Sequence, residues 1–377
     1  MKIVFTGGGT GGHFYPIIAV AEEIQRIARE RKLLEPSLYY IAPEPFEERT
    51  LFEHNITFKA SPAGKVRRYF SVLNFFDLFK TAWGILQSLL IVFRIFPDVV
   101  FSKGGFASIP TLVAARIFRI PVVVHESDAV PGRASLWGGK FAVRIGVSYP
   151  EAAQYFPSDR TALIGNPIRR EIQIPAREGA LEFLGLTPGV PVLLVVGGSQ
   201  GSRNLNEALL TALPSLVERY QIIHQTGKKN VDEVRSTAQV ILEKHPYAER
   251  YRAFDYLNPL AIRMAAGVAS LIVSRAGSSA IFEMAAWGIP SIVVPIPEEV
   301  SHDQKRNAYA YARSGAAVVI EEKNLSPHVF VAEVDRLMGD DKLRAHMAAA
   351  AKNFSRPDAA TKLAEAVINV ALQHETS

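Results

Sequence analysis

The chain has 377 residues, of which 48% are hydrophobic and 21% charged, and it contains no cysteine. This length suits two globular domains, and the lack of cysteine excludes disulfides and thiolate metal sites and favours a reducing compartment. A net charge of +5 fits an anionic ligand or a membrane surface but selects neither. The N-terminal sequence lacks the features of a secretory signal peptide, so we expect none.

Short apolar runs alternate with amphipathic stretches from the N-terminus onward. Lys2–Thr6 is expected to form a buried strand, followed by a glycine-rich loop and a helix over about residues 15–31. Further strands are expected at Ser37–Ala42 and at residues 98–102, 121–126 and 144–148. Strands that alternate with helices in this way are typical of a doubly wound parallel sheet.

One uncharged, largely apolar segment must be compared in length with a transmembrane helix. Residues 81–93 lie between Lys80 and Arg94 and number thirteen, whereas a transmembrane helix needs about 20 residues. We therefore expect a buried or an interfacial helix here.

The pattern then restarts in the second half. Residues 190–213 again read as strand, glycine loop and helix, and residues 274–294 resemble residues 102–124. The sequence therefore predicts an α/β protein with two Rossmann-like, doubly wound domains, residues 1–165 and 166–356, with a cleft between them. Helices are expected at Pro327–Met338 and at residues 341–353 and 359–373, and the C-terminal segment 357–377 is expected to cross back onto the first domain.

Three glycine-containing or small-residue segments are expected at the carboxyl ends of strands. Residues 7–12 contain five glycines, residues 197–201 form a second loop, and residues 275–279 begin a third helix with a cation nearby. Bare backbone at a helix start lets a phosphate or sugar approach the amide groups. The alternative is that the glycines only form tight turns. A dinucleotide site is disfavoured, because the acidic residue near the end of the second strand, Glu44, lies between two prolines.

Two titratable side chains belong to these segments. His13 follows the first glycine loop, and a helix start favours a neutral imidazole that can act as a general base. Glu283 lies one and a half turns into the third helix, where a carboxylate could accept both hydroxyls of a ribose. The alternatives are a histidine that only caps or packs and a solvated glutamate.

Several motifs together resemble one family. GGGTGGHFYP, SKGGFASIP, HESDAVPG, GNPIRRE, GGSQGSRNLN, SRAGSSAIFEMAAWGIPSIVVP and DQKRNA occur in the order found in MurG-type glycosyltransferases. The resemblance implies a glycosyltransferase B-type fold and inverting transfer of N-acetylglucosamine (GlcNAc) from UDP-GlcNAc. The acceptor would be the C4 hydroxyl of N-acetylmuramic acid in lipid I, and the product would be lipid II for peptidoglycan synthesis. It also implies donor binding by the second domain and acceptor binding by the first.

The same resemblance implies roles for individual residues. His13 matches the proposed base, Glu283 the ribose contact, and Gln304 a contact with the GlcNAc hydroxyls. The remaining matches are loop contacts with the phosphates at Thr10, Gly11 and Gly12, donor-diphosphate contacts at Arg169 and Ser199, an apolar uracil-side contact at Leu257, and the nucleotide-binding helix start at Ser278, Ser279, Ala280, Ile281 and Phe282. Asp128 stands where many members have asparagine. It would contact the substrate or act as the base, so His13 and Asp128 both remain candidate bases.

The leaving diphosphate needs stabilisation, and the sequence contains no Asp-x-Asp motif. We therefore expect helix amides and Arg169 to stabilise it without a metal or another cofactor.

We expect the protein to bind peripherally to the cytoplasmic face of the cell membrane. A cluster of basic and aromatic residues is expected to contact the acceptor and the anionic membrane surface: Lys65, Arg67, Arg68, Tyr69, Phe70, Phe75 and Phe76. The alternative is that these aromatics belong to the core.

Other functions remain open on the same architecture. A UDP-sugar 2-epimerase would need no acceptor, a non-catalytic sensor would bind UDP-GlcNAc without turnover, and an NAD-dependent oxidoreductase would change nicotinamide absorbance. A transferase with another acceptor is the nearest rival. The expected partners are UDP-GlcNAc, lipid I and the membrane surface, and no nucleic acid.

Overall fold

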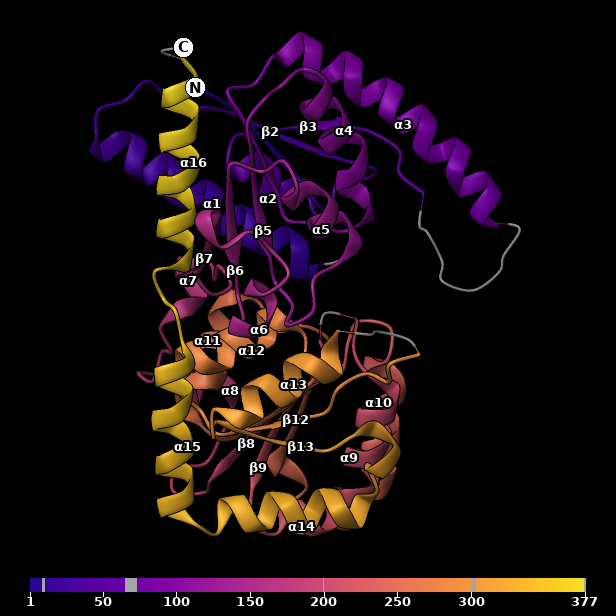
Figure 1. Ribbon diagram of the computed structural model, residues 1–377. Helices are drawn as coiled ribbons and strands as arrows, with labels where there is room; N and C mark the ends of the chain where they lie inside the picture. The colour runs from indigo at the N-terminus through magenta and orange to yellow at the C-terminus, as the bar shows by residue number, and fades with distance from the viewer. Residues whose placement is uncertain (9–10, 65–72, 199, 300–302, 376–377) are drawn as a thin grey trace. The chain divides into compact units, whose positions relative to one another are not determined.

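The computed structural model describes residues 1–8, 11–64, 73–198, 200–299 and 303–375 (Figure 1). The chain divides into two compact units. The first comprises Met1–Arg169 and Arg356–Ser377, and the second comprises Arg170–Ser355. Each unit contains one parallel sheet with helices packed on it, so the expected pair of Rossmann-like domains is confirmed.

The first unit is built on a seven-stranded sheet in the order β3-β2-β1-β4-β5-β6-β7. Every adjacent pair of its strands is parallel. Along β1, Ile3 and Phe5 pack on one face and Val4 on the other, because helices cover both faces. The strands are β1 (Lys2–Thr6), β2 (Ser37–Ala42), β3 (Ile56–Ala60), β4 (Val99–Ser102), β5 (Val122–Glu126), β6 (Arg144–Val147) and β7 (Thr161–Leu163).

The sequence reading missed β3 and β7. Only Ile56 is buried in β3, and β7 is only three residues long; both strands lie at sheet edges. Such edge strands carry little apolar signal. The helices of this unit are α1 (Gly11–Glu30), α2 (Glu48–Glu53), α3 (Leu73–Ile95), α4 (Ile109–Ile117), α5 (Arg133–Gly139), α6 (Pro150–Ala153) and α16 (Ala359–Glu375).

The second unit is built on a six-stranded parallel sheet in the order β10-β9-β8-β11-β12-β13. The strands are β8 (Val192–Val196), β9 (Gln221–Gln225), β10 (Tyr251–Phe254), β11 (Ala269–Ser274), β12 (Ser291–Val293) and β13 (Ala317–Val319). The helices are α7 (Arg170–Gln173), α8 (Ala180–Leu184), α9 (Arg203–Val217), α10 (Val231–Ile241), α11 (Pro259–Val268), α12 (Ser278–Trp287), α13 (Gln304–Arg313), α14 (Pro327–Met338) and α15 (Asp341–Phe354).

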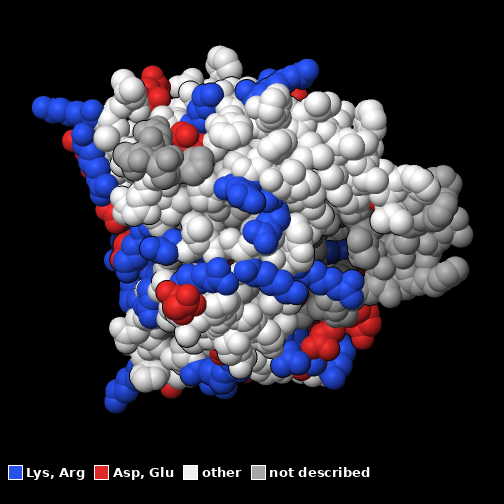
Figure 2. All heavy atoms as spheres, turned by 45° about the horizontal axis from the view of Figure 1, so that its top comes forward, with Lys and Arg blue, Asp and Glu red and all other residues white. Residues whose placement is uncertain are grey.

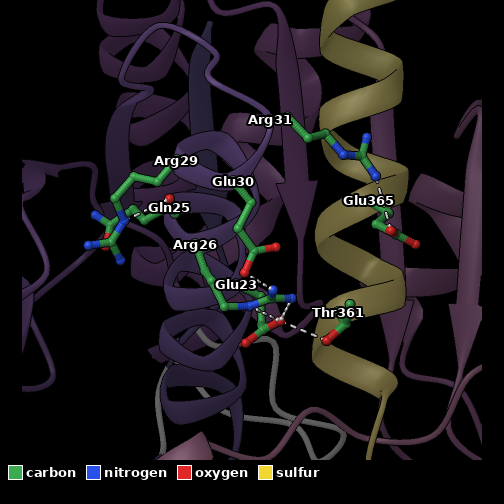
Figure 3. Close-up of polar contacts among 8 residues, drawn as sticks. All are labelled: Glu23, Gln25, Arg26, Arg29, Glu30, Arg31, Thr361 and Glu365. Atoms are coloured by element: carbon green, nitrogen blue, oxygen red, sulfur yellow. Dashed lines mark hydrogen bonds and ion pairs between the residues drawn. The ribbon is translucent and has the colours of Figure 1, made fainter.

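The C-terminal helix α16 packs on the first unit, beside α1. Its apolar residues, including Leu363 and Val367, join the core that α1 forms with the sheet. Figure 3 shows the polar contacts along this helix pair: Thr361 Oγ1 donates to Glu23 Oε2 at 2.7 Å, and Arg31 pairs with Glu365 at 3.1 Å. Apolar burial supplies most of the attachment, because exposed ion pairs contribute only about 0–1 kcal/mol.

Helix α3 differs from the expectation for residues 81–93. It has 23 residues and continues through Lys80 and Arg94, because a helix does not end at a single charge. The stretch Asp77–Ile95 is long and apolar enough to cross a membrane by length and composition, and 22% of it is buried. Trp83 and Phe93 are 58% and 64% exposed. The alternative of a buried core helix is therefore wrong for the face of α3 that carries Trp83 and Phe93.

Candidate functional site

The first glycine loop connects β1 to α1. The Gly7 carbonyl accepts a hydrogen bond from the Tyr40 hydroxyl at 2.6 Å. Gly7 has a φ of +146°, and a Cβ there would lie 2.9 Å from the Cβ of Lys103. A side chain would therefore be strained at Gly7 by its neighbours alone. Thr10 lies outside the described residues.

Helix α1 begins at Gly11, earlier than the expected residue 15. The first four amide groups of any helix lack a partner within the helix, so glycine loses no hydrogen bond there. Gly12 is exposed and has no side chain that could cover the start of the helix. This is the arrangement that suits an anion at a helix N-terminus.

His13 is the third residue of α1 and is partly buried. A Cβ on Gly105 would lie 3.4 Å from its Nε2, so glycine at that position makes room for the ring. Burial, and then the positive charge of Lys103, lower the pKa of His13 from 6.5 to about 4. The ring is therefore neutral at pH 7 and can accept a proton. The lowered pKa agrees with the sequence prediction, but its main causes are burial and a lysine.

Lys103 is a buried cation that the sequence reading did not single out. It follows β4, its backbone amide donates to the Thr6 carbonyl at 2.8 Å, and its Nζ donates to Ser127 Oγ. Burial lowers its pKa to about 8, and the carboxylates of Glu126 and Asp128 oppose that effect. A charged residue directly before two glycines at a strand end, as in SKGG, is the signal that could have identified it.

Glu126 fixes the segment that carries Asp128. Its carboxylate accepts the backbone amides of Asp128 at 2.9 Å and Gly132 at 3.1 Å. Burial raises the pKa of Glu126. Asp128 itself is partly buried and interacts electrostatically with Lys103. One lysine thus acts on both candidate bases, His13 and Asp128.

Arg169 lies in the first unit. Its guanidinium stacks over the Tyr15 ring at 4.2 Å from the centroid, which holds it beside the first turns of α1. The carbonyl of Gly165, four residues earlier, bonds to Nε2 of the buried His125 at 2.9 Å. Arg169 therefore lies beside Tyr15, near the start of α1.

The second glycine loop connects β8 to α9. Gly201 has a φ of +76°, and a Cβ there would lie 2.0 Å from the Thr226 carbonyl oxygen. The Gln225 side chain donates to the Gly198 carbonyl at 3.1 Å and accepts the Leu257 amide at 2.9 Å. Sequence reasoning missed Gln225, which ties the glycine loop to Leu257. The Leu257 side chain is buried, and Ser199 lies outside the described residues.

The third helix, α12, begins at Ser278, and Gln304 lies near its start. Gln304 begins α13, its Oε1 accepts the Ile296 amide at 3.2 Å, and its Nε2 lies 4.0 Å from where a Cβ of Gly277 would stand. Glu283 is partly buried in the second turn of α12. Of the other predicted residues in α12, Ser278 is buried, Ser279 and Ala280 are partly buried, and Ile281 and Phe282 are buried in the core.

Arg275, expected as a cation at this edge, is held by protein groups. It donates to the Val294 carbonyl at 3.1 Å and to Ser202 Oγ at 2.5 Å, and it pairs with Glu322. It therefore braces three segments that follow strands of the second sheet.

The fold and these groups define a class of α/β protein. Each of its two units has a parallel sheet with helices that begin shortly after strands, and one of these helices presents a neutral histidine. Among the described residues, no group of three or more His, Asp or Glu side chains could hold a metal ion. The arrangement is suited to binding a phosphorylated ligand by backbone amides and to removing a proton next to it.

Comparison with known proteins gives the family. Residues 3–147 match the N-terminal domain model of glycosyltransferase family 28, and residues 192–363 match its C-terminal domain model. A Treponema denticola protein is 37% identical, covering 87% of this chain and 86% of its own length, and one from Halothermothrix orenii is 36% identical over 95% of both. Both are named UDP-N-acetylglucosamine--N-acetylmuramyl-(pentapeptide) pyrophosphoryl-undecaprenol N-acetylglucosamine transferase.

The chain belongs to the MurG-type members of glycosyltransferase family 28, and it is a glycosyltransferase. The crystal structure of Acinetobacter baumannii MurG has a TM-score of 0.75 at 25% identity and covers 98% of this chain and 99% of its own. A Neisseria meningitidis UDP-GlcNAc 2-epimerase shares the fold alone, with a TM-score of 0.68 at 15% identity and coverage of 98% and 100%. The expected family and fold are confirmed.

Proposed function

We propose that the chain transfers GlcNAc from UDP-GlcNAc to the C4 hydroxyl of N-acetylmuramic acid in lipid I and so forms lipid II and UDP. The observation that carries the proposal is His13, a histidine held neutral in the first turn of α1 beside two glycine segments. The names of the relatives supply the donor sugar and the lipid-linked acceptor. An epimerase would not need this acceptor.

The reaction is an inverting displacement. The acceptor O4 attacks C1 of GlcNAc while a base takes its proton, and the bond from C1 to the UDP oxygen breaks with its electron pair on the diphosphate. His13 fits the role of base because its ring is neutral at pH 7. Helix-start amides, with Arg169, would stabilise the growing negative charge without a metal.

The substrates are assigned by unit. The first unit, with His13 and Asp128, would bind the acceptor. The second would bind the donor, with Glu283 on the ribose, Gln304 on the sugar hydroxyls and the backbone near Leu257 beside the uracil. Thr10, Gly11 and Gly12 of the first glycine segment and Ser199 of the second would contact phosphates. Gln304 is supported by its place at the start of α13, near Gly277, and Glu283 by its place in the second turn of α12, which follows Gly277.

The proposed location is the cytoplasmic face of the membrane. A lipid-linked acceptor requires the enzyme to reach the bilayer, and α3 exposes Trp83, Leu86, Leu90 and Phe93 along its length. The predicted residues Lys65, Arg67, Arg68, Tyr69 and Phe70 lie outside the described residues, as do the side chains of Phe75 and Phe76. Changing all three bases to glutamate should release the protein from anionic liposomes and slow transfer to membrane-embedded acceptor, while sparing a short-chain soluble analogue. Equal loss on both acceptors would refute docking.

The experiment that tests the reaction uses His13→Ala with purified protein, labelled UDP-GlcNAc and a short-chain lipid I analogue. Turnover should fall about 10²–10⁴-fold, as expected for a lost general base, while UDP affinity changes by no more than a few-fold. His54→Ala, a histidine of the same unit that pairs with Glu22, is the matched control and should retain activity. Near-normal turnover of His13→Ala would move the role of base to Asp128. Absence of a disaccharide product in the wild-type reaction would refute the proposed function.

A further inference from the structure

A chain of hydrogen bonds runs through the second unit and ends at the segment that follows β9. Tyr251 begins β10, His224 lies in the neighbouring strand β9, and Asn206 is the fourth residue of α9. The Tyr251 hydroxyl lies 2.8 Å from Nδ1 of His224, and Nε2 of His224 lies 3.0 Å from Oδ1 of Asn206. Nδ2 of Asn206 donates to the Thr226 carbonyl at 3.1 Å.

These hydrogen bonds can run in only one direction. The Thr226 carbonyl only accepts, so the amide nitrogen of Asn206 must face it and Oδ1 must face His224. Oδ1 also only accepts, so the proton of the neutral ring lies on Nε2, and Nδ1 accepts from the Tyr251 hydroxyl. Burial lowers the pKa of His224 to about 3, so the ring is neutral at pH 7. The Tyr251 hydroxyl therefore selects the tautomer that holds Asn206 in this orientation.

Burial makes each of these bonds hard to replace. Figure 2 shows many Lys and Arg side chains at the surface of the molecule, where water can take the place of a lost partner. His224, Asn206 and Thr226 are buried instead. A buried acceptor that loses its donor has no water to replace it, so the loss of one bond disturbs its neighbours in the chain.

The chain ends where the second glycine segment, residues 197–201, packs against the segment after β9. A Cβ on Gly201 would lie 2.0 Å from the Thr226 carbonyl oxygen, and a Cβ on Gly227 would lie 2.6 Å from the amide nitrogen of Gly201. The two backbones therefore touch with no side chain between them. Displacement of the Thr226 carbonyl would move the glycine segment, because nothing between them can absorb the change.

We propose that Tyr251 and His224 are positioning residues that hold the second glycine segment in the geometry that binds the diphosphate of UDP-GlcNAc. They act through Asn206 and Thr226 rather than by contact with the donor. The proposal rests on the proposed function, which assigns a phosphate contact to this segment. The uracil side is held separately, because the Leu257 amide donates to the side chain of Gln225, which is not a member of the chain of hydrogen bonds.

The first test uses Tyr251→Phe, which removes the hydroxyl and keeps the ring. Calorimetry should show that UDP binds about 5–10-fold more weakly, the order expected for one buried hydrogen bond. Uridine, which lacks the phosphates, should keep its wild-type affinity. The KM for UDP-GlcNAc should rise by a similar factor while kcat with the soluble acceptor analogue changes by less than about 2-fold. An unchanged UDP affinity, or an equal loss for uridine, would overturn the proposal.

Tyr220→Phe is the matched control. It also removes a tyrosine hydroxyl from the second unit, one that donates to Asp335 Oδ1 at 3.0 Å. Tyr220 directly precedes β9, so it lies at the opposite end of this strand from Thr226. The control should bind UDP as the wild type does. An equal loss of UDP affinity in both variants would show that general loosening of the unit acts rather than this chain of hydrogen bonds, and would overturn the proposal.

The second test measures whether the two residues act through one another. His224→Leu removes both hydrogen bonds of the ring and should weaken UDP binding at least as much as Tyr251→Phe does. The double variant should bind UDP no more weakly than His224→Leu, because the hydroxyl has already lost its partner. Additive losses would overturn the proposal. If His224→Leu does not fold, nitrogen NMR of the wild-type ring replaces it: the proton should lie on Nε2, and a proton on Nδ1 would overturn the proposal.

Failure of the proposed function can be recognised separately. A wild-type protein that binds UDP but forms no disaccharide would refute the transfer reaction. The affinities for UDP and uridine would still decide the role of Tyr251 and His224.

Discussion

The charge on Lys103 should contribute to setting the pH at which His13, the proposed base, becomes protonated. Lys103 is buried, bonds to Ser127 and acts electrostatically on His13 and Asp128. Methionine has a similar length and no charge, so Lys103→Met removes the cation with little change in volume. Because a nearby cation disfavours the protonated imidazole, its removal should raise the pKa of His13.

The structure limits the size of this change. The pKa of His13 falls from 6.5 to about 4, and burial is a larger cause than Lys103. Lys103 therefore accounts for less than half of the decrease. Its removal should move the pKa of His13 upward by about 1 pH unit or less, which corresponds to at most about 1.4 kcal/mol of interaction.

The assay is the pH dependence of kcat/KM with the soluble acceptor analogue, which reports the ionisation of the free enzyme. The acidic limb should lie near pH 4 in the wild type and move upward in Lys103→Met. The same upward movement should occur in an Asp128→Asn background if His13 is the base. Lys140→Met, which removes an exposed lysine of the same unit, is the control and should leave the limb in place.

Two results would refute the reasoning. An acidic limb that stays near its wild-type pH in a folded Lys103→Met protein would show that the lysine does not act on the base. A shift toward lower pH would have the wrong sign for the loss of a cation. Thermal unfolding of each variant establishes that the compared proteins are folded.

Three further predictions concern the second unit. Glu283→Ala should weaken UDP binding by about 1.5–3 kcal/mol in calorimetry, the usual loss for a charged hydrogen-bond partner, and unchanged affinity would remove Glu283 from the nucleotide site. Gly201→Ala should destabilise the protein by several kcal/mol in denaturant unfolding, because a Cβ would lie 2.0 Å from a carbonyl oxygen. Gly189 also has a positive φ, +82°, but no atom lies within 4 Å of the position of its Cβ, so Gly189→Ala should lose only about 1–2 kcal/mol. Equal losses would contradict the steric argument. Burial lowers the pKa of His224 from 6.5 to about 3, so as the pH falls this histidine binds a proton in the unfolded chain before it does so in the folded chain. The free energy of unfolding should therefore decline by up to about 4 kcal/mol as the pH falls from 6.5 toward 3. In His224→Gln, unfolding midpoints measured over the same acidic range should decline less.

Much of the fold follows from local sequence. Lys2–Thr6 and Ser37–Ala42 have strand ends as predicted, because strands buried on both faces are continuous apolar runs bounded by polar or turn residues. Pro327–Met338 likewise has the predicted ends, with Ser326 capping the helix by accepting the Val329 amide. The edge strands β3 and β7 were missed because they bury few residues.

The candidate site of the first unit likewise has features that the local sequence determines and features that depend on the tertiary structure. The sequence by itself determined the glycine loops and the histidine that follows the first of them, because these residue types are local and adjacent in the chain. Only the tertiary structure decided that Lys103, ninety residues later, lies close enough to lower the pKa of His13, and that Glu126 holds the segment of Asp128. The exposed face of α3 was also decided by tertiary packing. Burial and electrostatic interactions depend on which distant segments the fold brings together, and no local pattern contains that information.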